Sequence, residues 1–255
     1  MFQYLDPNLK KDVFGWRSPA LGMDMPIARY GDWGHALLVF PTASGDFEEA
    51  ERFFLIKSIE PFIFEGRIQV FSIESINNHA WMNDHLSVAE QAHNTNQYSK
   101  YLEGEVVPHI RRCLQDDGAR IAVTGASFGC FFAANAFFRR PDMFDILIAM
   151  SGFFDLGPTY LHGYGDENVY FNNPWSYMSG LSDHGRLEFF RHHTQINIVT
   201  GQGAYERPEA SVRFSELLWS KSIPHSLDLW GYDVNHDWPW WRRMLPHYVA
   251  EKVRW

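Results

Sequence analysis

Short, nearly continuous hydrophobic runs alternate with longer amphipathic stretches along most of the chain. Runs of this kind are typical of strands buried on both faces of a sheet, and the amphipathic stretches are typical of helices. Strands are predicted at 26–31, 35–42, 67–75, 119–125, 144–152, 195–201 and 224–231. Helices are predicted at 46–62, 86–114, 128–140, 208–222 and 239–255, with a kink or break at Pro108 and a break near Pro246. The alternation predicts an α/β fold, with a mostly parallel sheet of about eight strands covered by helices on both faces.

Residues 153–185 do not follow this rhythm. They are rich in Gly, Asn, Pro and Tyr and show no clear period. Such a stretch is typical of an irregular excursion near a functional site. Because we find no internal repeat and no linker, residues 1–255 are predicted to form a single domain that carries this excursion.

Composition and charge narrow the classes of function. The chain of 255 residues is 45% hydrophobic and 16% aromatic, which supports a sizeable core and argues against disorder. Its net charge of -9 disfavours a nucleic-acid partner. We find neither a signal-peptide pattern nor an apolar run long enough to span a membrane. The two cysteines, Cys113 and Cys130, need not pair, so a reduced, cytoplasmic protein is expected. The sequence does not determine the oligomeric state, and it is compatible with a homo-oligomer.

One serine lies between two glycines where a predicted strand meets a predicted helix. The segment Gly125-Ala126-Ser127-Phe128-Gly129 fits the G-x-S-x-G nucleophile elbow, a tight turn that presents the serine. Larger residues at the glycines would clash with the adjoining strand and helix. The helix also points its N-terminal N–H groups at the place where negative charge would develop. Ser127 is therefore the predicted nucleophile, and a plain glycine-rich loop is the alternative.

A serine nucleophile requires a general base, and the base requires an orienting acid. In this architecture the chain order is Ser, then Asp or Glu, then His, which places the histidine after the last strand. His236 lies in that loop, whereas His225 opens the last strand and His247 lies well inside the closing helix. His236 is the predicted base, and a surface histidine beside Asp237 is the alternative interpretation.

The acid should follow an earlier strand end. Glu206 lies in the loop after the strand at 195–201 and is our first choice. Asp155 follows the preceding strand and is the alternative acid, since some relatives of this architecture place the acid there. Asp228 lies within the last strand, and Asp233 is too close to His236 in sequence to orient it comfortably.

Two backbone N–H groups are expected to form the oxyanion hole. One is that of Phe128, directly after the nucleophile, and the other comes from the loop after the third strand. That loop is "FPTASG" (40–45), and we assign its donor to Ala43. Trp81 and Trp238 lie in predicted loops near the strand ends, where ligands bind, so both are candidate substrate contacts.

With these residues identified, the chain resembles an esterase family of α/β-hydrolases that includes esterase D-like S-formylglutathione hydrolases, feruloyl esterases and mycolyltransferases. The matching segments are "GASFG" around Ser127, "GQGAYE" after the seventh strand, "NHDWPWW" around His236, and "INNHAWMND" at 77–85. The resemblance begins near residue 35. It implies the α/β-hydrolase fold and serine esterase chemistry, and it places Trp81 near the cleft.

The chain departs from the family pattern in two places. The family acid is more often Asp and lies closer to its strand, where this chain has Gly203-Ala204. A Glu a few residues later, as in the mycolyltransferases, keeps the role for Glu206. The oxyanion loop also lacks the histidine-glycine run of many lipases.

The other signals do not indicate a cofactor or a metal. The pairs His192-His193 and Asp183-His184 lack metal-ligand spacing, and no phosphate-binding loop is present. The predicted function is hydrolysis of small carboxylic esters through Ser127, His236 and Glu206. An acyltransferase using the same triad and a hydrolase-fold binding protein without activity are the alternatives. A carboxylate within about 3.2 Å of a ring nitrogen of His236 would favour an enzyme over the binding protein.

Overall fold

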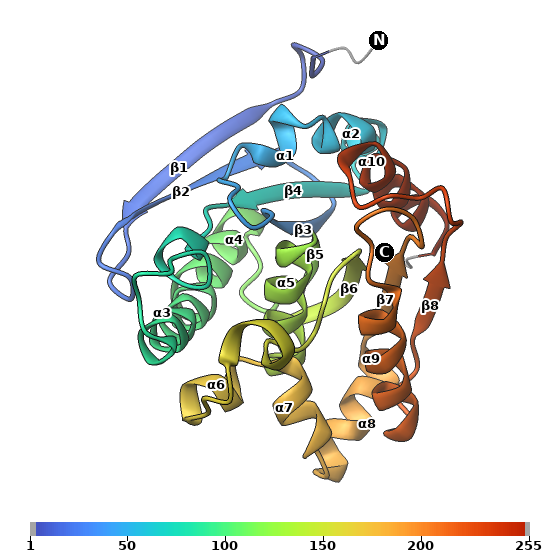
Figure 1. Ribbon diagram of the computed structural model, residues 1–255. Helices are drawn as coiled ribbons and strands as arrows, with labels where there is room; N and C mark the ends of the chain where they lie inside the picture. The colour runs from blue at the N-terminus through green and yellow to red at the C-terminus, as the bar shows by residue number, and fades with distance from the viewer. Residues whose placement is uncertain (1–3, 253–255) are drawn as a thin grey trace.

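The computed structural model describes residues 4–252, except for the side chains of residues 158 and 252. An eight-stranded sheet crosses the molecule in the order β1-β2-β4-β3-β5-β6-β7-β8 (Figure 1). The strands are β1 (Lys11–Arg17), β2 (Asp24–Tyr30), β3 (His35–Phe40), β4 (Ile68–Ile73), β5 (Ile121–Ala126), β6 (Phe144–Met150), β7 (Gln195–Thr200) and β8 (Ser226–Leu229). β2 pairs antiparallel with β1 and β4, and every other pair is parallel. The predicted mostly parallel sheet is confirmed.

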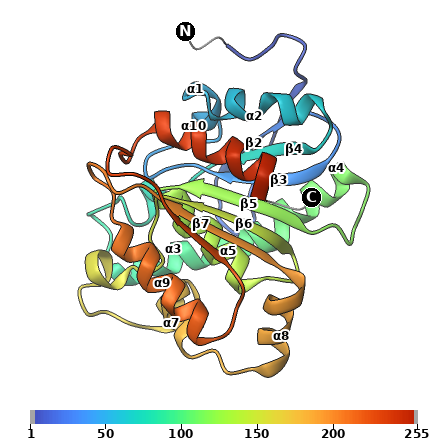
Figure 2. The ribbon, with the colours of Figure 1, turned by 90° about the vertical axis from the view of Figure 1, so that its right-hand side faces the viewer.

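Helices cover both faces of this sheet (Figure 2). On one face lie α1 (Glu49–Arg52), α2 (Leu55–Phe64) and α10 (Trp238–His247). On the other lie α3 (Val88–Tyr101), α4 (Val107–Leu114), α5 (Phe128–Arg139), α6 (Glu167–Phe171), α7 (Pro174–Ser179), α8 (His184–His193) and α9 (Pro208–Ser220). Within the described residues, no helix is long and apolar enough to cross a membrane.

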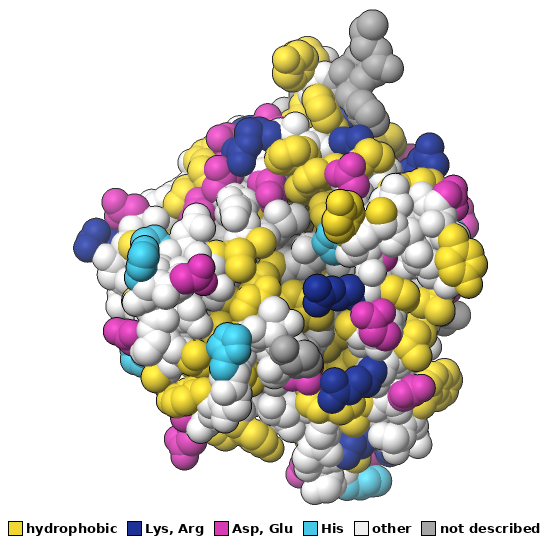
Figure 3. All heavy atoms as spheres, in the orientation of Figure 1, with side chains coloured by type: hydrophobic (Ala, Val, Ile, Leu, Met, Phe, Trp, Pro, Cys, Tyr) yellow, Lys and Arg dark blue, Asp and Glu magenta, His cyan; other side chains and the backbone are white. Residues whose placement is uncertain are grey.

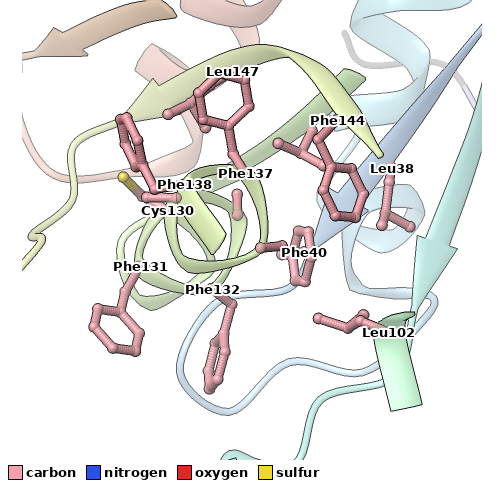
Figure 4. Packing of buried hydrophobic residues seen from close by; sticks show 14 of the residues in the cluster. Leu38, Phe40, Leu102, Cys130, Phe131, Phe132, Phe137, Phe138, Phe144 and Leu147 are labelled. Carbon is pink, nitrogen blue, oxygen red and sulfur yellow. The ribbon is translucent and has the colours of Figure 1, made fainter. Parts of the chain in front are cut away.

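The central strands are hydrophobic throughout because both of their faces are buried. In β3, Leu37 and Val39 pack in the cluster under α2 and α10, whereas Leu38 and Phe40 pack in the cluster around α5. Helix α5 is itself buried on all sides, which explains its uniformly apolar sequence. Phenylalanines radiate from it into the surrounding core (Figure 4). This rigid helix begins directly after Ser127.

Strand β1 is absent from the sequence-based prediction. It is an edge strand whose residues are half-buried or exposed, so it has no continuous hydrophobic run to identify it. The helix predicted over 46–62 divides into α1 and α2. The division falls at Phe54, which adopts a left-handed backbone conformation with φ 60°.

The chain stays helical at both prolines, although a kink or break was predicted at Pro108 and a break near Pro246. A π-helical segment, Leu102–Val106, joins α3 to α4, and Pro108 lies in the first turn of α4, where a missing N–H costs little. Helix α10 continues through Pro246, and a second π-helical segment, Tyr248–Lys252, follows it. The stretch predicted to be irregular, 153–185, contains a π-helical turn (Gly157–Leu161) and the short helices α6 and α7. A one-turn 3₁₀ helix, Asn77–His79, follows β4.

Candidate active site

Ser127 occupies a strained turn between β5 and α5. Its backbone dihedrals, φ 57° and ψ -123°, belong to a region that L-residues rarely adopt. A β-carbon on Gly125 would lie 2.3 Å from the carbonyl carbon of Gly129, and one on Gly129 would lie 2.5 Å from the Phe40 oxygen. Both glycines are therefore required by close backbone packing. The turn has the geometry that exposes a serine side chain beyond the end of a strand.

Glu206 approaches His236 from a buried position. Its side chain is 1% exposed, and its Oε2 lies 3.4 Å from Nδ1 of His236. This is slightly longer than 3.2 Å, and catalytic hydrogen bonds are often long before substrate binds. Ser151 donates its hydroxyl to Oε1 at 2.6 Å, and Thr200 donates to Oε2 at 3.0 Å. These contacts hold the carboxylate in one orientation.

The charge of Glu206 reflects two opposing influences. Burial is the largest, and by itself it raises the pKa of the carboxyl. The hydrogen bonds from His236, Ser151 and Thr200, together with the attraction of the imidazole, outweigh burial and lower the pKa below 4.5. Glu206 is therefore a carboxylate at neutral pH. A carboxylate at Nδ1 favours the imidazole tautomer that keeps its proton on Nδ1 and leaves Nε2 free to accept one.

Backbone hydrogen bonds join the loop that carries Glu206 to the loop that carries His236. Gly203 N donates to Val234 O at 2.8 Å, and His236 N donates to Ala204 O at 3.0 Å. The two loops follow β7 and β8 and run together at one edge of the sheet (Figure 1). A β-carbon on Gly201 would lie 2.1 Å from Val234 O. The glycines of "GQG" thus permit the close contact that brings the acid to the histidine.

Aromatic rings support the imidazole from its other side. The ring of Trp241, 4% exposed, meets His236 edge-on with centroids 5.1 Å apart. Trp241 packs against Trp238, which stacks on Phe53 at 4.6 Å. Trp238 is not among the residues that line the cavity around Ser127, and its contact with substrate stays a prediction.

Ser127 and His236 line the same cavity, whose volume is about 270 Å³. Its walls include Phe153, Tyr160, Tyr205 and Arg207. The structure contains no hydrogen bond between the Ser127 hydroxyl and the His236 ring, although both side chains are described. On the face shown in Figure 3, basic side chains border a hollow that is lined by hydrophobic side chains.

The loop after β3, which holds Ala43, is tied down by a buried acid. Glu49, 6% exposed, accepts hydrogen bonds from the Thr42 backbone N–H and hydroxyl, both at 2.7 Å. Burial is the largest influence on the pKa of Glu49 and raises it, against the opposing effect of the two Thr42 bonds. A β-carbon on Gly129 would lie 2.6 Å from Pro41 O, so the first turn of α5 rests against this loop. The segments that carry Ala43 and Phe128 therefore pack together.

Asp155 and Trp81, two further candidates, have other partners. Asp155 lines the cavity with His236, and its carboxylate accepts a hydrogen bond from Asn173 at 3.0 Å and pairs with Arg213 at 3.4 Å. Trp81 is buried at 2% exposed and contacts Tyr160, with ring centroids 6.0 Å apart. It lines a neighbouring cavity of about 330 Å³ that shares Tyr160 with the cavity at Ser127.

Sequence reasoning missed Ser151, Thr200 and Arg207. Ser151 and Thr200 lie where the adjacent parallel strands β6 and β7 end, the edge of the sheet at which such folds bind ligands. Their place at the ends of two predicted strands could have identified both residues from the sequence. Arg207 directly follows the predicted acid in the sequence. Within residues 4–252, no group of three or more His, Cys, Asp or Glu side chains is arranged to hold a metal ion.

Comparison with known proteins places this architecture among the α/β-hydrolases. A family model described as "Putative esterase" matches residues 73–251. A ferulic acid esterase superposes with a TM-score of 0.72 at 17% identity, covering 94% of this chain and 96% of its own. An S-formylglutathione hydrolase from Staphylococcus aureus superposes with a TM-score of 0.72 at 13% identity, covering 95% of this chain and 98% of its own. MPT51 from Mycobacterium tuberculosis superposes with a TM-score of 0.67 at 16% identity, covering 95% of this chain and 97% of its own. No curated protein sequence matches the chain significantly. The structural likenesses confirm the α/β-hydrolase fold.

Proposed function

The chain belongs to this esterase family, and from that premise we propose that it hydrolyses carboxylic esters with Ser127 as nucleophile, His236 as general base and Glu206 as the orienting acid. The observation that carries the proposal is the convergence of three features. Ser127 lies on a strained elbow, and it lines one cavity with His236. The buried, ionised carboxylate of Glu206 lies 3.4 Å from Nδ1 of that histidine.

The reaction follows from these groups. His236 Nε2 takes the proton of the Ser127 hydroxyl while the serine oxygen attacks the ester carbonyl. The resulting tetrahedral intermediate collapses, the bond to the alcohol breaks, and His236 returns the proton to the departing alcohol. Water then attacks the acyl-enzyme with the same help and releases the acid. Glu206 stabilises the imidazolium during each step without taking its proton.

We assign the oxyanion hole to the backbone N–H groups of Phe128 and Ala43. Phe128 is the first residue of α5, whose N-terminus favours negative charge. Glu49 holds the Ala43 loop through Thr42, so it acts as a positioning residue for the second donor. Donors that are fixed before the reaction need not reorganise when the charge develops, which is the main source of their effect.

Ser127→Ala tests the nucleophile. We expect hydrolysis of a short-to-long series of 4-nitrophenyl esters to fall by about 10⁴-fold or more, because the remaining groups cannot form an acyl-enzyme. Initial rates measure the loss, and the chain-length profile of the wild type measures the acyl pocket.

Ser182→Ala is a matched control, since Ser182 is an exposed serine that does not line the cavity around Ser127. Covalent labelling of the wild type, but not of Ser127→Ala, by a fluorophosphonate provides a second readout. Equal hydrolysis by the wild type and Ser127→Ala would contradict the assignment.

A further inference from the structure

Arg207 is an exposed residue in the cavity wall, and no acidic side chain of the described residues forms a salt bridge with it. It lines the cavity with Ser127 and His236. Within the described part of the chain, its guanidinium forms no salt bridge, hydrogen bond or ring contact, although most arginines of this protein do. Its charge does act on the cavity wall. The pKa of Tyr160 is raised by burial, and the charge of Arg207 opposes that rise.

Arg213, a second arginine near the cavity, differs from Arg207 because its side chain has partners within the protein. Arg213 pairs with Asp155 at 3.4 Å, and its guanidinium lies 3.7 Å from the centre of the Trp175 ring. Asp155 is fully engaged, since its other oxygen accepts from Asn173 and from the Gly157 N–H. The acid in the cavity wall is therefore balanced by Arg213, and it does not neutralise Arg207.

The position of Arg207 also makes its charge unfavourable for folding. It is the residue before the first turn of α9, a helix of 13 residues. The positive end of the helix dipole lies there, so a cation at this place is destabilising unless an anion joins it. Glu209 follows in the first turn, but it forms no salt bridge with Arg207. An anion bound beside Arg207 would remove this cost.

Further donors surround the same space. Thr159, Tyr160 and Tyr205 line the cavity, and their hydroxyls make no hydrogen bond to any described atom of the protein. Tyr205 is 91% exposed and has a left-handed backbone with φ 63°, so its ring stands at the rim beside Arg207. A guanidinium beside several hydroxyl groups that have no hydrogen-bond partner can bind the oxygen atoms of an anion.

We propose that the cavity recognises esters that carry a second, anionic group, a carboxylate in the first instance, and that Arg207 binds this group. The inference rests on the proposed esterase function and specifies its substrate class. The overall charge of -9 would repel an anionic ester, so its binding requires a local cation such as Arg207. Arg207 is thus a specificity residue that does not touch the reacting atoms.

Two pairs of esters test the proposal and locate the anion. For the acyl side, mono-(4-nitrophenyl) adipate is compared with neutral 4-nitrophenyl hexanoate. For the alcohol side, 4-acetoxybenzoate is compared with neutral 4-acetoxybenzamide. We expect one pair to show a preference for the anionic ester in kcat/KM of about fivefold or more, as for a partly exposed charge pair. Arg207→Gln should reduce that ratio to about one, and Arg207→Glu should invert it.

The matched control is Arg17→Gln, which removes the same charge from an arginine whose side chain is 71% exposed on the edge strand β1. It should leave the ratio at the wild-type value. Raising the salt concentration should lower the ratio in the wild type and leave it unchanged in Arg207→Gln. A ratio that is the same in wild type and Arg207→Gln for both pairs would overturn the inference. Failure of the neutral esters to react in a Ser127-dependent way would instead contradict the proposed function itself.

Discussion

Ser127 and His236 reach the same cavity by different structural means. Ser127 is held by covalent continuity between a buried strand and a buried helix, within a segment of five residues. His236 lies on a loop, and its position depends on hydrogen bonds to the loop of Glu206 and on packing against Trp241. The elbow is therefore a local structure, whereas the acid and histidine form a site only after two loops have met.

The comparison shows where a substitution will act. In the elbow, the constraint is steric, because backbone atoms of α5 lie too close for a β-carbon at Gly125, and those of β3 and the loop after it lie too close for one at Gly129. In the loops, the constraint is partly polar, because Glu206 is buried only with the help of Ser151, Thr200 and His236. Steric faults in a core are costly to stability, whereas faults in a loop affect the orientation of side chains.

The largest expected effect is that of His236→Ala, which removes the side chain that the loops position. We expect kcat to fall by about 10⁴-fold or more, as far as for Ser127→Ala, since nucleophile and base act as a unit. Steady-state rates on 4-nitrophenyl acetate measure it. The double variant should be no slower than either single variant. A further loss in the double variant would show that the two groups act independently.

Glu206→Gln keeps the size of the acid and removes its charge. We expect kcat to fall by about 10²- to 10⁴-fold, because a neutral amide neither stabilises the imidazolium nor selects its tautomer. The control is Glu209→Gln, an exposed acid in the first turn of α9, which should change kcat by less than about twofold. A loss of similar size in the two variants would remove Glu206 from the proposed triad.

Substitution of glycine by alanine compares the two regions directly. Gly129→Ala forces a β-carbon against the carbonyls of Phe40 and Pro41, and we expect it to lower the free energy of unfolding by about 1–3 kcal/mol. Gly201→Ala places a β-carbon 2.1 Å from Val234 O. Because the loop can shift, we expect a smaller loss of stability and about a 10- to 100-fold lower kcat.

Chemical denaturation and steady-state rates on each variant separate these outcomes. Gly104→Ala is the control, since a β-carbon there meets no atom within 4 Å. If Gly201→Ala lowered stability as much as Gly129→Ala and left kcat unchanged, the proposed difference between the regions would be wrong.

The smallest expected effect is that of Ser151→Ala on stability and its pH dependence. Loss of the bond to Glu206 should lower the free energy of unfolding by about 1–2 kcal/mol at pH 7. The pKa of Glu206 is below 4.5 in the folded protein, so its stabilising effect is present above that pH and is lost as the pH falls through the folded value. The difference between wild type and Ser151→Ala should therefore shrink under acid. Denaturation at a series of pH values measures it, and a difference that grew under acid would contradict the role of Ser151.

Much of the fold could be predicted from the sequence. The seven predicted strands and the helix after Ser127 correspond to strands β2 to β8 and helix α5. Buried apolar runs identify β3 to β7 and α5, whereas β8 was predicted although it is a half-buried edge strand. Strand β1 was not predicted because its sequence, KDVFGWR, contains no continuous apolar run and none of its residues is buried. Pro108 does not end its helical segment because it lies in the first turn of α4, where a missing N–H costs little, and α10 continues with Pro246 inside it.

By itself, the sequence determined most of the strands, the elbow and the chain order of the candidates Ser127, Glu206 and His236, since these follow from local residue patterns and from position along the chain. The tertiary structure decided which acid meets the histidine. Glu206 and Asp155 both follow strand ends, and only the packing of the β7 and β8 loops brings Glu206 to His236, while Arg213 takes Asp155. It also decided that Arg207 would be left unpaired beside Ser127. Pairing among charges depends on distances between segments far apart in the chain, and a linear pattern of residues does not contain those distances.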